Sequence, residues 1–332
     1  MSLRAAVIGT GRIGALHAAI YARDPRTELV GVVDADQQRA EQVAAELGTA
    51  AYASTEELLD RATPQVVSVA VPEGVRLQHS LLAARAGCHL LLEKPLAPSL
   101  QETDELIAGL ADAPGTVMVN FILRSDPRFL AVREAVQEGR LGTVRTVSAH
   151  RRGTAAGAQA LGEWTNLLIS TAIHDIDAMA WIVDAPVRRV YAEVIGGASA
   201  KWGHEDAVLA TFQFANGAIG SLDTSWVLPG TVPAPLDAGF KLIGTGGSAA
   251  IEGSNQGLSF VGDAGLQLPD LMHWPTGRDG VGGDLRASVS HFLDCVESGA
   301  TPVMTLADAR RTERVVHAIR ESAASGQPVL LD

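Results

Sequence analysis

The feature that most constrains the fold of this chain is a glycine-rich turn near its start. An apolar run at residues 4–8 ends in Gly9, and Gly11 and Gly14 follow as a helical pattern begins at Ile13. A short buried strand, a tight turn and a helix in this order form the first half of a β-α-β unit. We therefore expect the chain to start with the first strand and crossover helix of a parallel sheet.

Strand and helix patterns continue to alternate over the first third of the chain. Strands are predicted at 29–33, 66–71, 89–92 and 117–120, and helices at 37–47, 55–61, 78–86 and 101–110. In doubly wound parallel sheets the crossover helices cover both faces, so the strands are apolar throughout. We predict an α/β protein whose N-terminal domain, residues 1–120, is a doubly wound parallel sheet.

The pattern changes beyond residue 120. Helices are predicted at 129–138, 169–182, 285–298 and 306–325, strands at 144–150, 190–195, 207–214, 218–226 and 240–243, and loops at 153–162 and 253–283. Strands separated by Gly and Asn turns are typical of an antiparallel sheet of meander type. We predict a second, α+β domain over residues 121–332, with the C-terminal helix as a candidate to pack back on the first domain.

Length and composition exclude several classes of protein. A chain of 332 residues favours two domains over one. The net charge of −12 would repel a phosphate backbone, so no nucleic-acid partner is expected. Apolar runs fall short of the ~18 residues that cross a bilayer, and no signal-peptide pattern is found, so we expect a cytoplasmic protein without membrane contact. Cys88 and Cys295 are too few for a disulfide framework, and the nine histidines form no metal-ligand pair, so no metal is expected.

The glycine turn and Asp34 together predict a dinucleotide site. Gly9 permits the tight turn, Gly11 lets the backbone approach a pyrophosphate, and Gly14 lets the helix pack closely on the strand. Asp34, 20 residues beyond Gly14, is placed to accept from a ribose hydroxyl and to repel a 2′-phosphate, which favours NAD over NADP. The nearest basic residue, Arg39, lies inside the next predicted helix. The alternatives are an ordinary turn and, for Asp34, a helix cap of the Asp-x-x-Gln type.

Further short motifs follow along the whole chain. They are Val71-Pro72 with His79, Ala86-Gly87-Cys88-His89 before Glu93-Lys94-Pro95, Asn120-Phe121 with Arg124 and Pro127, Gly139-Arg140-Leu141-Gly142, Thr171-Ala172-Ile173-His174-Asp175-Ile176-Asp177, and Gly299-Ala300-Thr301-Pro302. In this order and spacing the chain resembles the glucose-fructose oxidoreductase, inositol dehydrogenase and rhizopine catabolism (Gfo/Idh/MocA) oxidoreductase family. In its motifs it is most similar to the inositol 2-dehydrogenases.

The resemblance implies a Rossmann domain followed by an α+β domain. The large open, mostly antiparallel sheet of the second domain would serve as an oligomer interface, so a homodimer or homotetramer is expected. Family members transfer hydride between a nicotinamide and a polyol or sugar carbon. Lys94 would lie beside the nicotinamide and the reacting hydroxyl, Glu93 would contact the nicotinamide end of the cofactor, and Pro95 would form a rigid, often cis, turn. The expected cofactor-binding residues are Gly9, Gly11, Arg12, Ile13, Gly14, Asp34, Val71, Pro72, Glu93 and Lys94.

The oxidation of an alcohol requires a base, and His174 is the candidate. The base removes the hydroxyl proton as hydride leaves the carbon, and a histidine changes its charge near neutral pH. Lys94 would hold and polarise the same oxygen. Without the resemblance, the alternative for His174 is a buried helix histidine bonded to a backbone carbonyl.

The chain departs from the inositol dehydrogenases at Ser170. These enzymes have an aspartate four residues before the histidine, where it orients the ring and stabilises its charged form. A serine can form a hydrogen bond but supplies no charge, so a strict myo-inositol assignment is in doubt. The alternatives are another sugar, a weaker base, or a base from elsewhere. For Asp175 and Asp177 we expect a cap or an arginine partner rather than the missing role.

Substrate contacts are expected from a small group of other side chains. The expected residues are Ser170, Asn120, Arg124 and Trp164. A salt bridge or a turn is the alternative for Asn120 and Arg124. Asn166, His273 and Trp274 fall in or near loops suited to a sugar pocket, with core packing as the alternative for the tryptophans.

Two other functions stay open at this point. One is a sugar-converting enzyme that retains its NAD(P) through the reaction. The other is a non-catalytic nicotinamide-binding regulator, which Ser170 suggests and which the intact Glu93-Lys94-Pro95 and His174 oppose.

Overall fold

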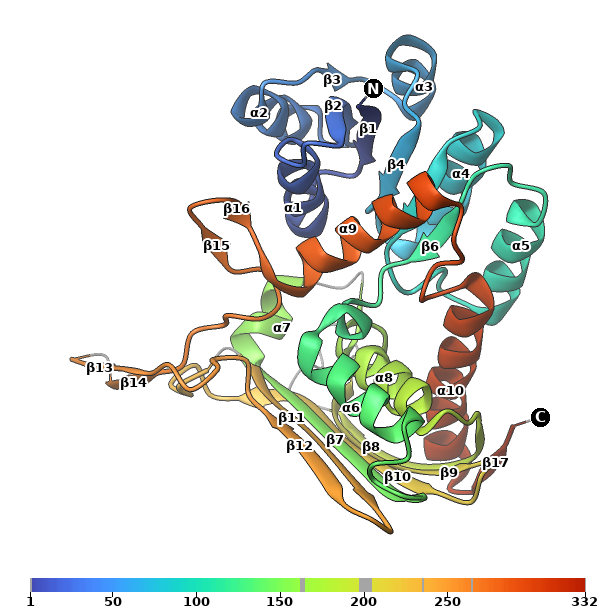
Figure 1. Cartoon of the computed structure of the whole chain (residues 1–332), viewed down its shortest axis with the longest axis vertical. Coiled ribbons are helices and arrows are strands. Elements are labelled where there is room, and N and C mark those ends of the chain that lie inside the picture. Colours follow the sequence, from blue (N-terminus) through green and yellow to red (C-terminus); the bar gives the residue numbers. More distant parts are fainter. Residues whose placement is uncertain (1, 162–164, 197–204, 235, 264, 332) are drawn as a thin grey trace. The chain divides into compact units, whose positions relative to one another are not determined.

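The chain divides into two compact units, each built on a sheet of its own (Figure 1). The computed structural model describes residues 2–161, 165–196, 205–234, 236–263 and 265–331. The first unit consists of Met1–Ile122 and Trp274–Arg310, and the second of Leu123–His273 and Arg311–Asp332.

A six-stranded parallel sheet forms the first unit. Its strands, in the spatial order β3-β2-β1-β4-β5-β6, are β1 (Leu3–Ile8), β2 (Thr27–Val33), β3 (Ala51–Tyr52), β4 (Val66–Val69), β5 (His89–Leu92) and β6 (Val117–Val119). Every neighbouring pair is parallel. The helices between the strands are α1 (Arg12–Tyr21), α2 (Gln37–Leu47), α3 (Thr55–Ala62), α4 (Glu73–Arg85) and α5 (Leu100–Leu110). The predicted doubly wound sheet is confirmed.

Local sequence explains where these helices start. Asp36, Ser54 and Ser99 each accept a hydrogen bond from a backbone N–H in the first turn of the helix that follows. Such N-caps satisfy donors that have no partner within the helix. Gly48, in the left-handed conformation with φ 68°, ends α2.

Helix α9 (Gly283–Ser298) belongs to the first unit although it lies far along the chain. Its apolar residues Val289, Phe292 and Leu293 are fully buried in the same core as Val7 and Tyr21. The sequence pattern assigned all of 121–332 to a second domain, whereas the segment from Trp274 to Arg310 packs in the first unit. The physical reason is the apolar stripe of α9, which is removed from water against the parallel sheet and α1.

A seven-stranded mixed sheet forms the second unit. In the spatial order β12-β11-β7-β10-β9-β8-β17, its strands are β7 (Val144–Thr154), β8 (Val187–Gly196), β9 (Glu205–Phe214), β10 (Ile219–Leu228), β11 (Leu236–Gly244), β12 (Ser248–Glu252) and β17 (Val329–Leu330). β8, β9 and β10 form the predicted meander, but β7 lies between β10 and β11 and runs parallel to β10. A simple meander is therefore wrong, because local turns do not encode the partners of a strand that pairs across a long stretch of sequence.

Helices of the second unit lie on one side of its sheet, as Figure 1 shows for α6 (Pro127–Gln137) and α8 (Ile173–Val183). A π-helical turn, η3 (Leu168–Ala172), leads directly into α8. The predicted loop at 153–162 is wrong, because its alanine-rich part forms the short helix α7 (Ala155–Leu161).

The stretch expected as loops at 253–283 contains two short ribbons. One pairs β13 (Phe260–Gly262) with β14 (Gly265–Gln267), and the other pairs β15 (Thr276–Gly277) with β16 (Gly280–Val281). The remaining elements are the 3₁₀ turn η1 (Ile122–Ser125) and α10 (Leu306–Ser325). Within the described ranges, no helix is both long and apolar enough to span a membrane.

Candidate active site

The glycine turn after β1 is as tightly packed as its spacing predicts. Gly9 has a φ of 92°, and a Cβ there would lie 2.6 Å from the carbonyl oxygen of Ala70. A Cβ on Gly14 would lie 1.8 Å from the carbonyl oxygen of Gly9. Gly11 differs, because a Cβ there would meet no atom of the described residues within 4 Å. Two glycines are thus required by the fold, and the third leaves open space for a ligand.

The start of α1 next to this open space suits an anion. Gly11 is the N-cap, and no side chain of the described residues caps this helix end. The first N–H groups of a helix have no partner within it and form the positive end of its dipole. The guanidinium of Arg12 lies over the ring of Trp274, 5.1 Å from its centroid. These groups fit the pyrophosphate of a dinucleotide.

Asp34 follows β2 and holds the glycine turn. Its Oδ2 accepts from the backbone N of Thr10 at 2.6 Å and from the Thr10 hydroxyl at 3.1 Å. Its Oδ1 accepts from the backbone N of Asp36 at 2.9 Å. The helix-cap alternative for Asp34 is excluded, because Asp36 is the N-cap of α2 and accepts from the backbone N of Arg39.

Arg39 also pairs with Asp34, a contact that its place in the sequence did not indicate. Its Nη2 lies 2.7 Å from Oδ1, and the Asp34 side chain is only 7% exposed. Burial opposes ionisation of this carboxyl, but the bonds from Arg39 and from the backbone N–H groups of Asp36 and Thr10 hold the pKa of Asp34 below its ordinary value. A buried, ionised carboxylate therefore follows β2.

The carboxyl ends of β1, β4 and β5 lie at one edge of the parallel sheet. Gly9 follows β1, Val71 and Pro72 follow β4, and Glu93 and Lys94 follow β5. A Cβ on Gly9 would lie 3.0 Å from Cγ1 of Val71, so these two loops are in contact. The Lys94–Pro95 peptide bond is cis, as the resemblance implied. In sheets of this order, ligands bind outside the carboxyl ends of the strands where the order reverses, which is here between β1 and β4.

Glu93 is joined to Asn120 and His17 in the interior of the first unit. Nδ2 of Asn120 donates to Oε1 of Glu93 at 2.6 Å, and Nε2 of His17 lies 3.2 Å from the same oxygen. The other end of the Asn120 amide accepts from Ser288 at 2.6 Å. The sequence pattern predicts Asn120 at the substrate and gives no indication of the roles of His17 and Ser288. The signal for the position of His17 is its place three residues after Gly14, on the face of α1 that packs on the sheet.

In the second unit, His174 and Ser170 share a partly exposed stripe on a buried helical segment. From Leu167 to Met179, all residues except Ser170 and His174 are buried. Asn166 lies on the same stripe one turn earlier, and its carbonyl oxygen accepts from the backbone N of Ser170 at 2.9 Å. Ser170 falls within the π turn, and π turns occur frequently at functional sites.

Two buried ion pairs fix the helix that carries His174. Nε of Arg151 lies 2.7 Å from Asp175, and Nη2 of Arg124 lies 2.7 Å from Asp177. All four side chains are at most 7% exposed. The expected arginine partners of the two aspartates are confirmed. The guanidinium of Arg124, a candidate substrate contact, is held by this ion pair.

His273, another candidate, lies in the loop between β14 and β15. Trp164 lies outside the described residues. Nδ1 of His273 lies 2.8 Å from Oδ2 of Asp270. Burial opposes ionisation of Asp270, but the bonds from His273 and from nearby backbone N–H groups lower its pKa to about 2. His273 is thus engaged by a carboxylate of its own loop.

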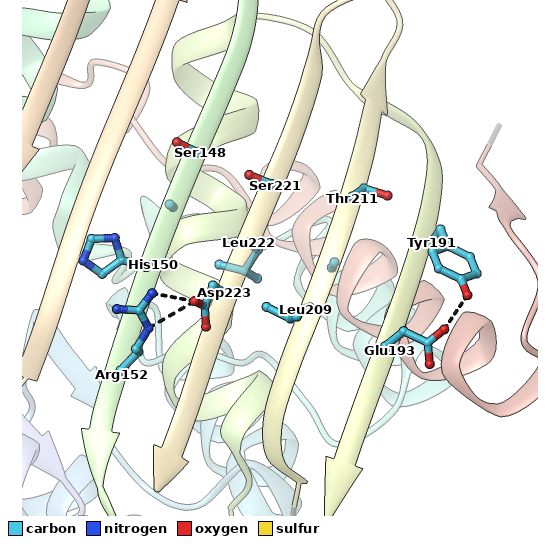
Figure 2. Close-up of a pocket in the computed structure, with 12 residues that line it drawn as sticks. Ser148, His150, Arg152, Tyr191, Glu193, Leu209, Thr211, Ser221, Leu222 and Asp223 are labelled. Atoms are coloured by element: carbon cyan, nitrogen blue, oxygen red, sulfur yellow. Dashed lines mark hydrogen bonds and ion pairs between the residues drawn. The ribbon is translucent and has the colours of Figure 1, made fainter. Parts of the chain in front are cut away.

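The opposite face of the seven-stranded sheet carries a shallow hollow, which Figure 2 shows across β7, β10, β9 and β8. Arg152 pairs there with Asp223, and Leu209 is exposed beside them. Alternation along β7 turns Arg151 toward α8 and Arg152 toward this face. None of the predicted site residues lines the hollow.

The fold and the glycine turn define a Rossmann sheet with the features of a dinucleotide-binding site. A model of the oxidoreductase family's NAD-binding Rossmann fold matches residues 3–121, and a model of the same family's C-terminal alpha/beta domain matches residues 133–331. The chain belongs to the Gfo/Idh/MocA oxidoreductase family.

Named relatives span most or all of the chain. The NAD(+)-dependent scyllo-inositol 2-dehydrogenase of Bacillus subtilis is 27% identical over 99% of this chain and 96% of that protein. The D-glucoside 3-dehydrogenase of Escherichia coli is 32% identical over 68% of this chain and 71% of that protein. The crystal structure of myo-inositol 2-dehydrogenase from Lactobacillus plantarum, 21% identical, superposes over the whole of both chains with a TM-score of 0.89 and shows the same fold.

The different surroundings of the glycines give a test of the cofactor cradle. Gly11→Ala is expected to leave the free energy of unfolding within about 0.5 kcal/mol, since no clash arises and its φ of −60° suits alanine. Its methyl group fills the cradle, so the dissociation constant for NAD should rise by about tenfold or more. Urea unfolding and isothermal titration calorimetry measure the two quantities.

The matched control is Gly14→Ala, which drives a Cβ into the Gly9 carbonyl and should lower stability as well as NAD affinity. A Gly11→Ala protein that binds NAD as tightly as the wild type would contradict the assignment of the cradle.

Proposed function

We propose that this protein is an NAD-dependent dehydrogenase of a cyclic polyol or sugar, similar to the inositol 2-dehydrogenases. The observation that carries the proposal is the position of Glu93-Lys94-Pro95 at the carboxyl end of β5, on the sheet edge that also holds the glycine turn. The substrate class is adopted from the names of the relatives, which act on inositols and a glucoside.

In the proposed reaction the protein manages the substrate hydroxyl and its proton. Bound NAD supplies the hydride acceptor. The ammonium group of Lys94 holds and polarises the hydroxyl oxygen, and His174 removes the hydroxyl proton as the carbon loses hydride. The neutral imidazole is the active form of this base, so oxidation is expected to weaken as the pH falls below neutrality.

Ser170 is proposed to set the specificity of this site. Asn166, Ser170 and His174 form one polar stripe on a helix whose direction is fixed by buried ion pairs. The Ser170 hydroxyl can bond the substrate or the imidazole, but it places no charge next to His174. We therefore expect a substrate preference different from that of enzymes with an aspartate at this position.

NAD is proposed as the cofactor in preference to NADP. The support is the buried, ionised carboxylate of Asp34, which would repel a 2′-phosphate. Arg39 is about half exposed and compensates part of that negative charge, so some affinity for NADP is expected to persist.

The face of the seven-stranded sheet that points away from α6 and α8 is here called the bare face. It is proposed as the contact between subunits of a homodimer or homotetramer. It exposes Ile195, Leu209, Ile219 and Ile243 by 44% to 64%. Exposed apolar groups on one face are typical of protein contacts. A cytoplasmic location stays a prediction from the sequence.

Calorimetric titration with the two nucleotides tests the role of Asp34. The dissociation constant for NAD should be lower than that for NADP by about tenfold or more. Asp34→Asn keeps the shape and removes the charge, so the two values should converge. Arg39→Ala should widen the difference, since it removes the cation that attracts the phosphate. Equal affinities in the wild type would contradict the proposal.

Lys94→Ala is expected to abolish turnover and to leave NAD affinity nearly unchanged, because the residue acts on the substrate oxygen. NADH absorbance with a panel of inositols, aldoses and their keto or lactone forms measures turnover. Arg85→Ala, which removes an exposed cation in the last turn of α4, is the control and should keep full activity. Full activity of Lys94→Ala would rule the mechanism out.

The same panel separates the remaining functions. Turnover of myo- or scyllo-inositol shows that Ser170 is compatible with an inositol enzyme, and turnover of another sugar alone makes Ser170 a specificity change. NAD binding without NADH formation on any substrate favours the retained-cofactor enzyme or the non-catalytic regulator.

Leu209→Arg places a charge in the middle of the bare sheet face and should shift the protein toward monomers. Size-exclusion chromatography with light scattering measures the mass. Val75→Arg changes an exposed apolar residue on α4 of the first unit and serves as the control. An unchanged mass in Leu209→Arg, with the wild type oligomeric, would locate the subunit contact elsewhere.

A further inference from the structure

A chain of buried hydrogen bonds runs from Tyr21 to Glu93 inside the first unit. The Tyr21 hydroxyl lies 2.8 Å from Oγ of Ser68, and Nδ1 of His17 lies 2.9 Å from the same oxygen. Nε2 of His17 lies 3.2 Å from Oε1 of Glu93. Tyr21, Ser68 and His17 have no exposed surface. The carboxylate at the end of β5 is thus connected through His17 to the interior of the sheet.

A second arm reaches the same carboxylate from α9. Ser288 donates to Oδ1 of Asn120 at 2.6 Å, and this bond fixes which end of the amide is the acceptor. Nδ2 of Asn120 is therefore a donor, and it lies 2.6 Å from Oε1 of Glu93. Asn120 is 1% exposed.

The hydrogen bonds between Tyr21, Ser68, His17 and Glu93 can be oriented so that each group donates to the next one in this order. Burial raises the pKa of Tyr21, so the phenol keeps its proton and donates to Ser68. Ser68 then donates to Nδ1 of His17, and Nε2–H of His17 donates to the carboxylate. Ser68 thereby sets the tautomer in which His17 can serve Glu93.

These donors decide the charge of Glu93. Burial alone would favour the protonated acid. The bonds from His17 and Asn120 and the nearby charge of Lys94 outweigh burial, so the pKa of Glu93 is lowered. Electrostatic attraction is mutual, so an ionised Glu93 also favours the ammonium form of Lys94.

We infer that His17 is a positioning residue for the hydride-transfer site, acting through Glu93 on Lys94. Its N–H holds the carboxylate in one orientation and keeps it ionised, and the carboxylate holds the Lys94 charge in place. The inference rests on the proposed role of Lys94. Among the described residues, the buried titratable groups on α1 and α9 besides His17 are Tyr21, Asp284 and Cys295, and Lys94 follows β5.

The kinetic test uses two variants of one residue. His17→Leu removes both ring nitrogens at similar volume, and His17→Gln restores a donor and an acceptor. Loss of the N–H raises the pKa of Glu93, so a second acid limb of the kcat/KM profile, at lower pH than the limb set by His174, should move up by about one pH unit in His17→Leu. His17→Gln should recover much of the difference, and the dissociation constant for NAD should stay within about twofold in both.

An independent readout needs no turnover. Infrared difference spectra of the cofactor-free protein, recorded over a pH titration, report the carboxylic acid band of Glu93. In His17→Leu this band should appear at higher pH than in the wild type, and Glu93→Gln in the same background should remove it. Should His17→Leu fail to fold in urea titrations, Ser68→Ala, which frees the tautomer of His17, takes its place.

The outcomes separate the two claims. An acid limb and a carboxylic acid band unchanged in a folded His17→Leu overturn the inference. A second outcome combines a shifted carboxylic acid band in His17→Leu with a wild-type protein that oxidises no polyol or sugar. This pair of results overturns the proposed function but supports the control of Glu93 by His17.

Discussion

The close approach of α1 to the glycine turn is the constraint on which the first unit depends. Gly14 has no side chain, and a single Cβ there would overlap the carbonyl oxygen of Gly9. Because the helix can sit this close, its N-terminus ends at the turn, and its inner face brings His17 and Tyr21 onto Ser68 of β4. The N-terminal end of one helix thus forms the candidate phosphate cradle, and its inner face contacts the Glu93 carboxylate through His17.

In the second unit, neighbouring side chains of β7 point to opposite faces of the sheet and have different roles. Arg151 turns inward from β7 and neutralises Asp175 in the helix that carries His174. Its neighbour Arg152 turns to the bare face and joins the ion pairs with Asp223 and Asp237. A buried carboxylate without its arginine would be strongly destabilising, so the inward pair holds the helix in one place. One strand therefore serves both the candidate active site and the proposed subunit contact.

Local patterns in the sequence were sufficient to predict much of this molecule. The glycine turn, Asp34 after β2, and Glu93 and Lys94 after β5 follow from short apolar runs and their end points. What could not be predicted depends on partners far apart in the chain. The insertion of β7 between β10 and β11, the bond from His17 to Glu93 and the link from Ser288 to Asn120 join residues separated by tens to hundreds of positions. The pairing of Arg39 with Asp34 was missed for another reason, because an arginine inside a helix gives no sign of where its long side chain reaches.

The return of α9 to the first unit affects the order in which this protein can be completed during synthesis. The six strands of the parallel sheet leave the ribosome early, but Val289, Phe292 and Leu293 belong to the same core and are made more than 150 residues after β6. Until they arrive, the apolar surface around Val7 and Tyr21 lacks part of its cover. The nucleotide-binding unit is therefore completed only after residues 123–273 of the second unit have been made, and its apolar core stays partly uncovered until then.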